Sequence, residues 1–298
     1  MAKTVAVDIE LARSHSLIRL ARSILRLLAR NPNMSLGLFI LTAAVLMGVF
    51  APFIDRFDPL RLSVQERLTS PNGTHWFGTD DLGRDLYART IHGARLSLFV
   101  GASVVFVVVI SGQIIGSVAG FDRRMDAILM RIMDAIMAFP GLLLALALMA
   151  MLGASIQNVI IAIGVSTLPS QARVVRSTVL SLRERPFVDA ASAMGVPTWR
   201  ILLFHIAPNT LGPVTIQATF LFAAAMLTEA GLSFIGVGVP DYVPSWGNIV
   251  SLGRNFLYTA PWIVIIPGIF LTSTVLAANL VGDGLRDIVD PRLRGTRS

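Results

Sequence analysis

Long apolar stretches alternate with short polar ones along most of this chain, and the pattern predicts an all-α membrane protein. Several stretches approach the roughly 20 residues that a helix needs to cross a bilayer. We expect six transmembrane helices, at about 35–54, 96–120, 132–152, 159–175, 210–232 and 261–281. Pro140, Pro169 and Pro267 fall inside three of them. Each removes a backbone N–H and favours a kink.

Composition and charge support this interpretation and suggest an orientation. Apolar residues make up 54% of the 298 residues and charged residues only 14%, whereas soluble domains carry roughly 25% charged residues. The net charge of +7 would suggest nucleic acid in a soluble protein. In a membrane protein, basic residues gather on cytoplasmic flanks, and the arginines here predict that both termini are cytoplasmic. The chain has no cysteine, which excludes disulfides and thiolate metal sites.

Three segments divide the chain. Residues 1–34 form a basic leader in which Arg19, Arg22, Arg26 and Arg30 recur at helical spacing, as expected of a cytoplasmic amphipathic helix on a membrane surface. A solvated leader is the alternative, and a cleaved signal peptide is disfavoured because no A-x-A site follows. Residues 35–95 hold the first transmembrane helix and a long extracytoplasmic loop. Residues 96–298 form a five-helix core.

The extracytoplasmic loop, residues 55–95, contains an Asp/Gly-rich run from His75 to Asp85. Such a run raises the possibility of a calcium site. It lacks the alternating acidic order and the later Glu of a calcium loop. A structured turn, with Trp76 and Phe77 at the level of the lipid headgroups, is the favoured interpretation.

Small residues mark a predicted helix contact in the second transmembrane helix. Gly112, Gly116 and Gly120 repeat at four-residue spacing. In lipid, this spacing lets a neighbouring backbone approach closely. We interpret the three glycines as a packing seam rather than a ligand site.

The stretch 185–209 predicts two short cytoplasmic helices joined at Gly195. Phe187, Ala190, Ala191 and Met194 form one narrow apolar stripe, and glycine followed by proline ends the first helix. A second amphipathic turn runs to Pro208 and leads into the fifth transmembrane helix. Such a protrusion, within a cytoplasmic loop 177–209, is suited to transmit a push from a partner into the membrane.

The sequence contains few residues that could form a catalytic or nucleotide-binding site. Lys3 is the sole lysine, so a phosphate-binding P-loop, which needs a lysine, is absent. The four histidines lie in separate segments, and no hydrolase motif appears. A secondary transporter is a rival, but the interrupted helices do not fall into two matching halves. A channel or an assembly factor is a further alternative.

One acidic residue lies within a predicted transmembrane helix. Glu229 falls near the outer end of the fifth. An acid at that depth is a functional candidate, here a gate. The alternative is a structural acid at the membrane interface, partly wet and capped by nearby backbone.

Several motifs resemble those of ABC importer permeases. Asp189-Ala190-Ala191, then Gly195 and Pro208, stand at the spacing of that family's EAA loop, with Asp in place of Glu. The segments HWFGTDDLGRD, GARLSL, EAGLSFIGVGVP with PSWG, and GDGLRDIVDPR occur in that order from His75 onward. Together they are similar to the C-type permease subunits of dipeptide, oligopeptide and nickel importers.

The resemblance implies that this chain is one subunit of a larger transporter in a bacterial inner membrane. It implies a type I ABC importer permease fold, a B-type permease partner, two cytoplasmic ATPase subunits and an extracytoplasmic solute-binding protein. ATP and Mg²⁺ would bind in the ATPases, so this chain would be no enzyme and would bind no cofactor or metal. The cargo would be di- or oligopeptides. By position, the ATPase contact would involve Phe187, Val188, Asp189, Ala190, Ala191, Met194 and Gly195.

Overall fold

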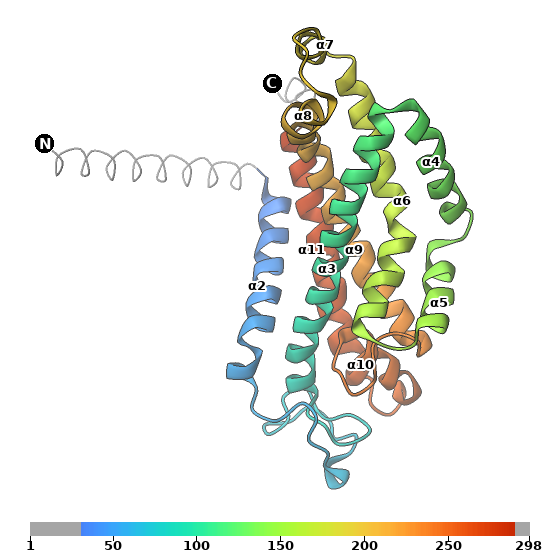
Figure 1. Ribbon diagram of the computed structural model, residues 1–298. Helices are drawn as coiled ribbons and strands as arrows, with labels where there is room; N and C mark the ends of the chain where they lie inside the picture. Colours follow the sequence, from blue (N-terminus) through green and yellow to red (C-terminus); the bar gives the residue numbers. More distant parts are fainter. Residues whose placement is uncertain (1–30, 290–298) are drawn as a thin grey trace, which may run out of the picture.

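The computed structural model describes residues 31–289 as an all-α protein (Figure 1). Residues 1–30 of the predicted amphipathic leader lie outside the described residues. Five helices are long and apolar enough to cross a membrane. They are α2 (Pro32–Ile54), α3 (Leu86–Phe121), α6 (Ile156–Arg183), α9 (Ala207–Ile235) and α11 (Trp262–Val289). A bent pair of shorter helices makes a sixth if it counts as one span.

Helix α3 begins at Leu86, well before the predicted position near residue 96. The Asp85 side chain caps it by accepting a 2.8 Å hydrogen bond from the backbone N–H of Ala88. The first turns carry Arg89 and Thr90, which are buried by the outer loops. These polar residues weaken the apolar pattern, so the prediction placed this part of the helix in the loop.

The predicted third span is broken rather than kinked. Helix α4 (Arg123–Met137) and helix α5 (Gly141–Leu152) meet at 87°. Pro140 sits between them in an extended conformation and has no N–H for an intrahelical bond. Residues 121–131, predicted as a loop, already lie largely in α4. There Asp122 accepts hydrogen bonds from the backbone N–H groups of Met125 and Arg124, which lower the pKa of its carboxyl group.

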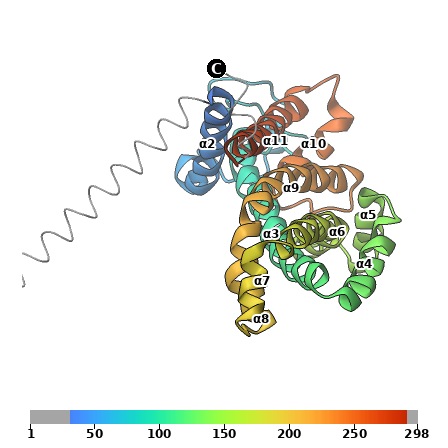
Figure 2. The ribbon, with the colours of Figure 1, turned by 90° about the horizontal axis from the view of Figure 1, so that it is seen from above.

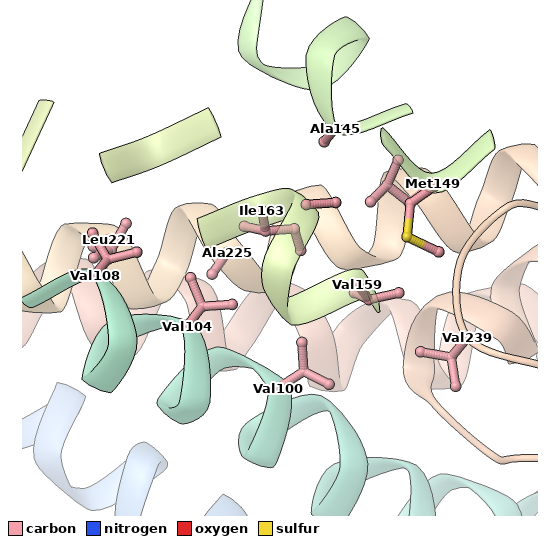
Figure 3. Close-up of a cluster of buried hydrophobic side chains, with 12 residues drawn as sticks. Val100, Val104, Val108, Ala145, Met149, Val159, Ile163, Leu221, Ala225 and Val239 are labelled. Atoms are coloured by element: carbon pink, nitrogen blue, oxygen red, sulfur yellow. The ribbon is translucent and has the colours of Figure 1, made fainter. Parts of the chain in front are cut away.

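The main core lies between α3, α5, α6 and α9 (Figure 3). Val100, Val104 and Val108 line one face of α3 at helical spacing, and they pack with Ile163 of α6 and Leu221 of α9. A second cluster joins α2, α3, α9 and α11 around the buried Trp246. Seen from above, α3 and α9 therefore hold a central position (Figure 2).

The two ends of the bundle differ in character. One end carries α7 (Pro186–Ala193) and α8 (Thr198–Ile201), together with the start of α2 and the end of α11 (Figure 1). The opposite end carries the 55–85 loop and α10 (Trp246–Gly253), a short helix within the predicted outer loop 233–254. The fold thus separates a compact helical protrusion from a larger loop-built cap.

Candidate functional site

Helix α7 is short because its two ends are fixed by proline and glycine. Pro186 occupies the first turn, where its missing N–H costs nothing. At the other end, Gly195 has a φ of +74°. Its N–H donates to Ser192 O (3.0 Å), and the Val196 N–H donates to Ala191 O (3.1 Å). These two bonds form a Schellman motif, so the chain reverses sharply here.

The second helix of the protrusion continues without a break into the membrane. After α8, residues Leu202–Ile206 form a π-helical turn, and α9 follows at Ala207. Pro208 would clash with the carbonyl of Phe204 in a regular α-helix and donates no hydrogen bond to it. In the π turn, the Ala207 N–H reaches back to Leu202 O instead. Pro208 therefore lies in the first turn of α9, which follows the widened turn directly, as the sequence predicts.

We call residues 186–206 the knob. Its inner face is anchored to the bundle by Val188, Ala191, Ile201 and Ile206. They pack with valines of α6 and α9. Val188 is only 3% exposed. This corrects the expectation that Val188 and Ala191 belong to a contact face, because their side chains are already covered by this chain.

The outer face of the knob is apolar. Its exposed side chains include Phe187, Met194 and Trp199, and Met194 is 77% exposed. Asp189 and Ala190 are exposed beside them, as is Gly195. Exposed apolar patches of this kind mark interaction sites. Five of the seven predicted contact residues therefore lie on a surface that a partner can reach.

The glycines of α3 lie where it meets α6. A Cβ at Gly116 would come within 2.6 Å of Ala172 O and of Val175 Cβ. At Gly120 it would meet Val179 at 2.7 Å, and at Gly112 it would meet Gln171 at 2.6 Å. All three positions therefore exclude a side chain. Val175 and Val179, which face Gly116 and Gly120, also belong to the hydrophobic cluster that anchors the knob. The α3–α6 contact therefore continues directly into the anchor of the knob.

Glu229 lies at the opposite end and is 1% exposed. Its Oε1 accepts hydrogen bonds from the hydroxyls of Ser233 (2.9 Å) and Ser245 (3.0 Å). Ser245 also caps α10 by accepting from the Asn248 N–H. Glu229 is therefore buried from solvent, and its carboxylate is hydrogen-bonded by side-chain hydroxyls. The sequence-based alternative of a structural acid had instead expected a partly hydrated residue capped by backbone groups. Glu229 ties α9 to the first residue of the α10 segment.

Helix α10 is also tied to α3. The Trp246 indole N–H donates to Thr90 O at 2.9 Å, and the Trp246 backbone N–H donates to the Ser97 hydroxyl. The Asn248 side chain donates to Val239 O at 3.0 Å within its own loop. Sequence reasoning missed this helix. The Ser-Trp-Gly-Asn run, with serine at the cap position, was the signal that could have revealed it.

The predicted turn at residues 75–85 is a compact polar cluster. His75 Nδ1 lies 2.7 Å from Asp85 Oδ2, so the residue that caps α3 also holds this histidine. Asp80 accepts a 2.6 Å hydrogen bond from Arg84 Nε. Phe77 is partly buried and packs edge-on against Tyr87, while Trp76 is half exposed. The cluster fixes the loop onto the start of α3.

Two ion pairs, also missed from the sequence, join α4 to α6. Arg176 binds Asp126 through two contacts of 2.5 and 2.6 Å. Arg173 binds Asp134 through a single contact of 2.6 Å. The apolar pattern of the sequence indicates no partner for Arg173 or Arg176. It could not foresee their partners, because both acids lie in the broken third span.

Comparison with known proteins shows to which family this chain is similar. The family described as binding-protein-dependent transport system inner membrane component matches residues 112–295. The dipeptide transport system permease protein DppC of Alkalihalophilus pseudofirmus is 43% identical over 274 residues, which cover 92% of this chain and 90% of that protein. The oligopeptide transport system permease protein OppC of Bacillus subtilis is 40% identical over 265 residues, covering 89% and 87%.

A solved structure shares the fold. A chain of the MetNI methionine ABC transporter, in an inward-facing conformation, has a TM-score of 0.56 at 18% identity. The match covers 68% of this chain and 97% of that chain. The fold and the exposed knob thus define a multi-pass helical membrane protein of the ABC importer permease class. The chain belongs to the binding-protein-dependent transport system inner membrane component family.

Proposed function

We propose that this chain is the C-type permease subunit of an ATP-driven peptide importer. It forms a translocation path with a B-type permease and receives di- or oligopeptides from an extracytoplasmic solute-binding protein. Two cytoplasmic ATPases drive it, and ATP and Mg²⁺ bind there, so the chain itself catalyses no reaction. The names of its relatives support the peptide cargo, since they include dipeptide and oligopeptide permeases at 40% identity or more.

The observation that carries the coupling role is the continuity of the knob with α9. One face of the knob is anchored on α6 and α9, while the other is exposed and apolar. Its second helix passes through the π turn straight into a membrane-spanning helix. A movement of the exposed face is therefore transmitted to α9 with no flexible linker between them. Phe187, Asp189, Ala190, Met194 and Gly195 offer the ATPase contact, and Val188 and Ala191 position it.

The proposal fixes an orientation. With the knob in the cytoplasm, the start of α2 and the end of α11 lie on the cytoplasmic side. The 55–85 loop and α10 then face the binding protein. In this orientation Glu229, at the base of α10, lies on the outer side, where it would act as a gate residue or as a structural acid.

Crosslinking tests the coupling contact directly, because the chain has no cysteine of its own. We expect Met194→Cys to crosslink to a cysteine-bearing ATPase subunit in the assembled transporter. Val188→Cys is the matched control within the same knob, and its buried side chain should not crosslink. Crosslinking at 188 but not at 194 would contradict the proposed contact face.

Transport assays separate the rival classes. In proteoliposomes that hold the whole complex, uptake of a tripeptide of alanine should require ATP and the binding protein. It should survive collapse of the proton gradient. Uptake that follows the proton gradient without ATP would instead identify a secondary transporter.

A further inference from the structure

A groove with apolar walls runs along the outside of the bundle between α2, α3, α9 and α11. Its volume is about 650 Å³. On its rim stand Phe106 of α3 and Leu211 of α9, which are 68% and 57% exposed. The two hydroxyl groups in its lining, those of Thr215 and Thr219, donate to carbonyls of their own helix at 2.7 and 2.8 Å. The lining side chains therefore leave no free hydrogen-bonding group for a polar ligand.

At the end nearer the outer loops, this groove continues into a smaller hollow that contains a charged residue. The two cavities share Val45 of α2 and Leu98 of α3 in their linings, so they form one continuous surface. The hollow measures about 310 Å³ and is also lined by Gly48 and Arg95. A Cβ at Gly48 would lie 3.1 Å from the backbone nitrogen of Arg95, so α2 and α3 approach closely here. We call the two cavities together the lateral groove.

Arg95 is exposed and has no partner within the described part of the chain, where its guanidinium group makes no ion pair or hydrogen bond. One turn nearer the outer loops, His92 Nε2 lies 2.9 Å from Asp55 Oδ2 and joins α3 to the end of α2. The apolar run of α3 begins directly after Arg95, at Leu96. Arg95 thus lies where the polar end of the bundle meets its apolar surface. Arginines near the ends of membrane helices reach the lipid headgroups from such positions.

The size and chemistry of the lateral groove favour a lipid over other occupants. Both volumes fall in the range of about 300–1,000 Å³ that is typical of pockets for single small molecules. A peptide backbone would need hydrogen-bonding partners, which the apolar walls do not provide. A neighbouring membrane helix packs closely against small residues, whereas the bulky side chains of Phe106 and Leu211 form the rim here. A phospholipid matches both parts, because it combines apolar chains with a phosphate.

We propose that the lateral groove binds one phospholipid of the outer leaflet, with its phosphate on Arg95 and an acyl chain between α3 and α9. A guanidinium group suits this role because it binds phosphate through two parallel hydrogen bonds. From Arg95 to Ile110, α3 rises about 22 Å, which exceeds the roughly 15 Å of hydrocarbon in one leaflet. The groove is therefore long enough for an acyl chain. Only the assignment to the outer leaflet rests on the proposed function.

A lipid bound here would brace the base of the knob. Val109 and Val214 line the groove, and both also pack in the hydrophobic cluster that anchors the knob. An acyl chain along the groove fills the space beside this cluster and holds α3 against α9. Since a ligand that binds the folded state stabilises it, phosphatidylglycerol should raise the Tm of the detergent-purified transporter. Arg95→Gln should reduce that rise.

Photocrosslinking tests the site in the assembled transporter. The probe is a phosphatidylglycerol that carries a photoreactive diazirine at the end of one acyl chain, added to the complex in a phosphate-free detergent. We expect saturable labelling of α3 and α9 along the lateral groove. Excess phosphatidylglycerol should prevent it, whereas diacylglycerol, which has the same chains and no phosphate, should compete severalfold less well. Labelling that neither lipid prevents would overturn the proposal.

Variants separate the phosphate contact from the chain contact. Arg95→Gln should lower labelling severalfold, and Arg95→Lys, which keeps the cation, should retain most of it. Ala218→Trp fills the lining of the groove and should also lower labelling. Arg61→Gln is the control, because it removes an exposed arginine of the outer loop that lies outside the lateral groove. Equal labelling of wild type, Arg95→Gln and Ala218→Trp would overturn the lipid site.

Other occupants, and a failure of the proposed function, give different results. A Phe106→Cys crosslink to the second permease, or labelling of the groove by a photoreactive tripeptide, would replace the lipid with a subunit interface or a cargo path. If lipid labelling fails while peptide uptake and the Met194→Cys crosslink persist, the lipid site is wrong and the proposed function stands. If uptake and that crosslink fail while labelling persists, the proposed function is wrong and the lipid site stands.

Discussion

At the residue scale, backbone conformation and buried hydrogen bonds make particular side chains irreplaceable. Gly195 illustrates the first case. Nothing lies within 4 Å of where its Cβ would be, yet its φ is +74°. The constraint at this position is therefore the left-handed backbone and not space. Gly116 is the reverse, since α6 occupies the place of its Cβ.

We predict that Gly195→Val uncouples ATP hydrolysis from peptide uptake. A left-handed conformation costs a residue with a Cβ roughly 1–2 kcal/mol, and a β-branched one more, so the Schellman turn opens and the exposed face of α7 tilts. Gly195→Asn should keep most uptake, because Asn tolerates this conformation. The measurement is the ratio of peptide transported to ATP hydrolysed in proteoliposomes.

Gly153→Val is the matched control for this prediction. Gly153 has a φ of +83° and equally open surroundings, but it lies at the opposite end of the bundle, after α5. It should leave the transport-to-hydrolysis ratio unchanged. Equal uncoupling by Val at 153 and at 195 would mean that general strain, not the knob, is responsible.

A second residue-scale prediction concerns Glu229. Glu229→Ala leaves the hydroxyls of Ser233 and Ser245 without their shared acceptor, and buried unsatisfied groups cost about 1–3 kcal/mol each. Glu229→Gln keeps an acceptor oxygen of the same shape. We therefore expect a clearly lower Tm in detergent for the alanine variant and a much smaller change for the glutamine variant. Equal loss in both would show that the negative charge itself, and not the hydrogen bonds, is required.

At the element scale, the sequence predicts those helices whose environment is uniform and fails where tertiary contacts decide. The long helices α2, α9 and α11 stand out because apolar residues cover them nearly all round. The start of α3 and the helix α10 escape prediction because they carry polar residues that the fold buries, such as Arg89 and Asn248. The break at Pro140 follows from the proline, but the proline alone does not predict a bend as large as 87°.

The sequence likewise predicts some features of the candidate site and not others. The position of the knob and its reversal at Gly195 follow from local sequence signals. Local signals do not show which face of the knob is buried, because that depends on contacts with valines of α6 that form only in the folded protein. The partners of Arg173 and Arg176 were equally out of reach, since they lie about 40 or more residues away in the chain.

The α3–α6 seam gives an element-scale prediction. Gly116→Leu would place a side chain where Ala172 O and Val175 now lie. The helices must separate, and overpacking of this kind costs about 1–3 kcal/mol or more. Since Val175 also anchors the knob, we expect a lower Tm together with weaker crosslinking from Met194→Cys. Gly164→Leu on α6, whose Cβ would meet only Val108 at 3.8 Å, should have the smaller effect in both measurements.

At the scale of the whole molecule, the two ends of the bundle must lie on opposite sides of the membrane. The exposed loop residue Val64 and the exposed knob residue Met194 mark these ends. We predict that an impermeant thiol reagent added to intact cells labels Val64→Cys, after the outer membrane is permeabilised where one is present. Met194→Cys should be labelled only after the inner membrane is opened or inverted. Because both sites are 76–77% exposed, a difference in labelling reports sidedness and not burial. Labelling of both from the same side would contradict the orientation on which the coupling role and the peptide path depend.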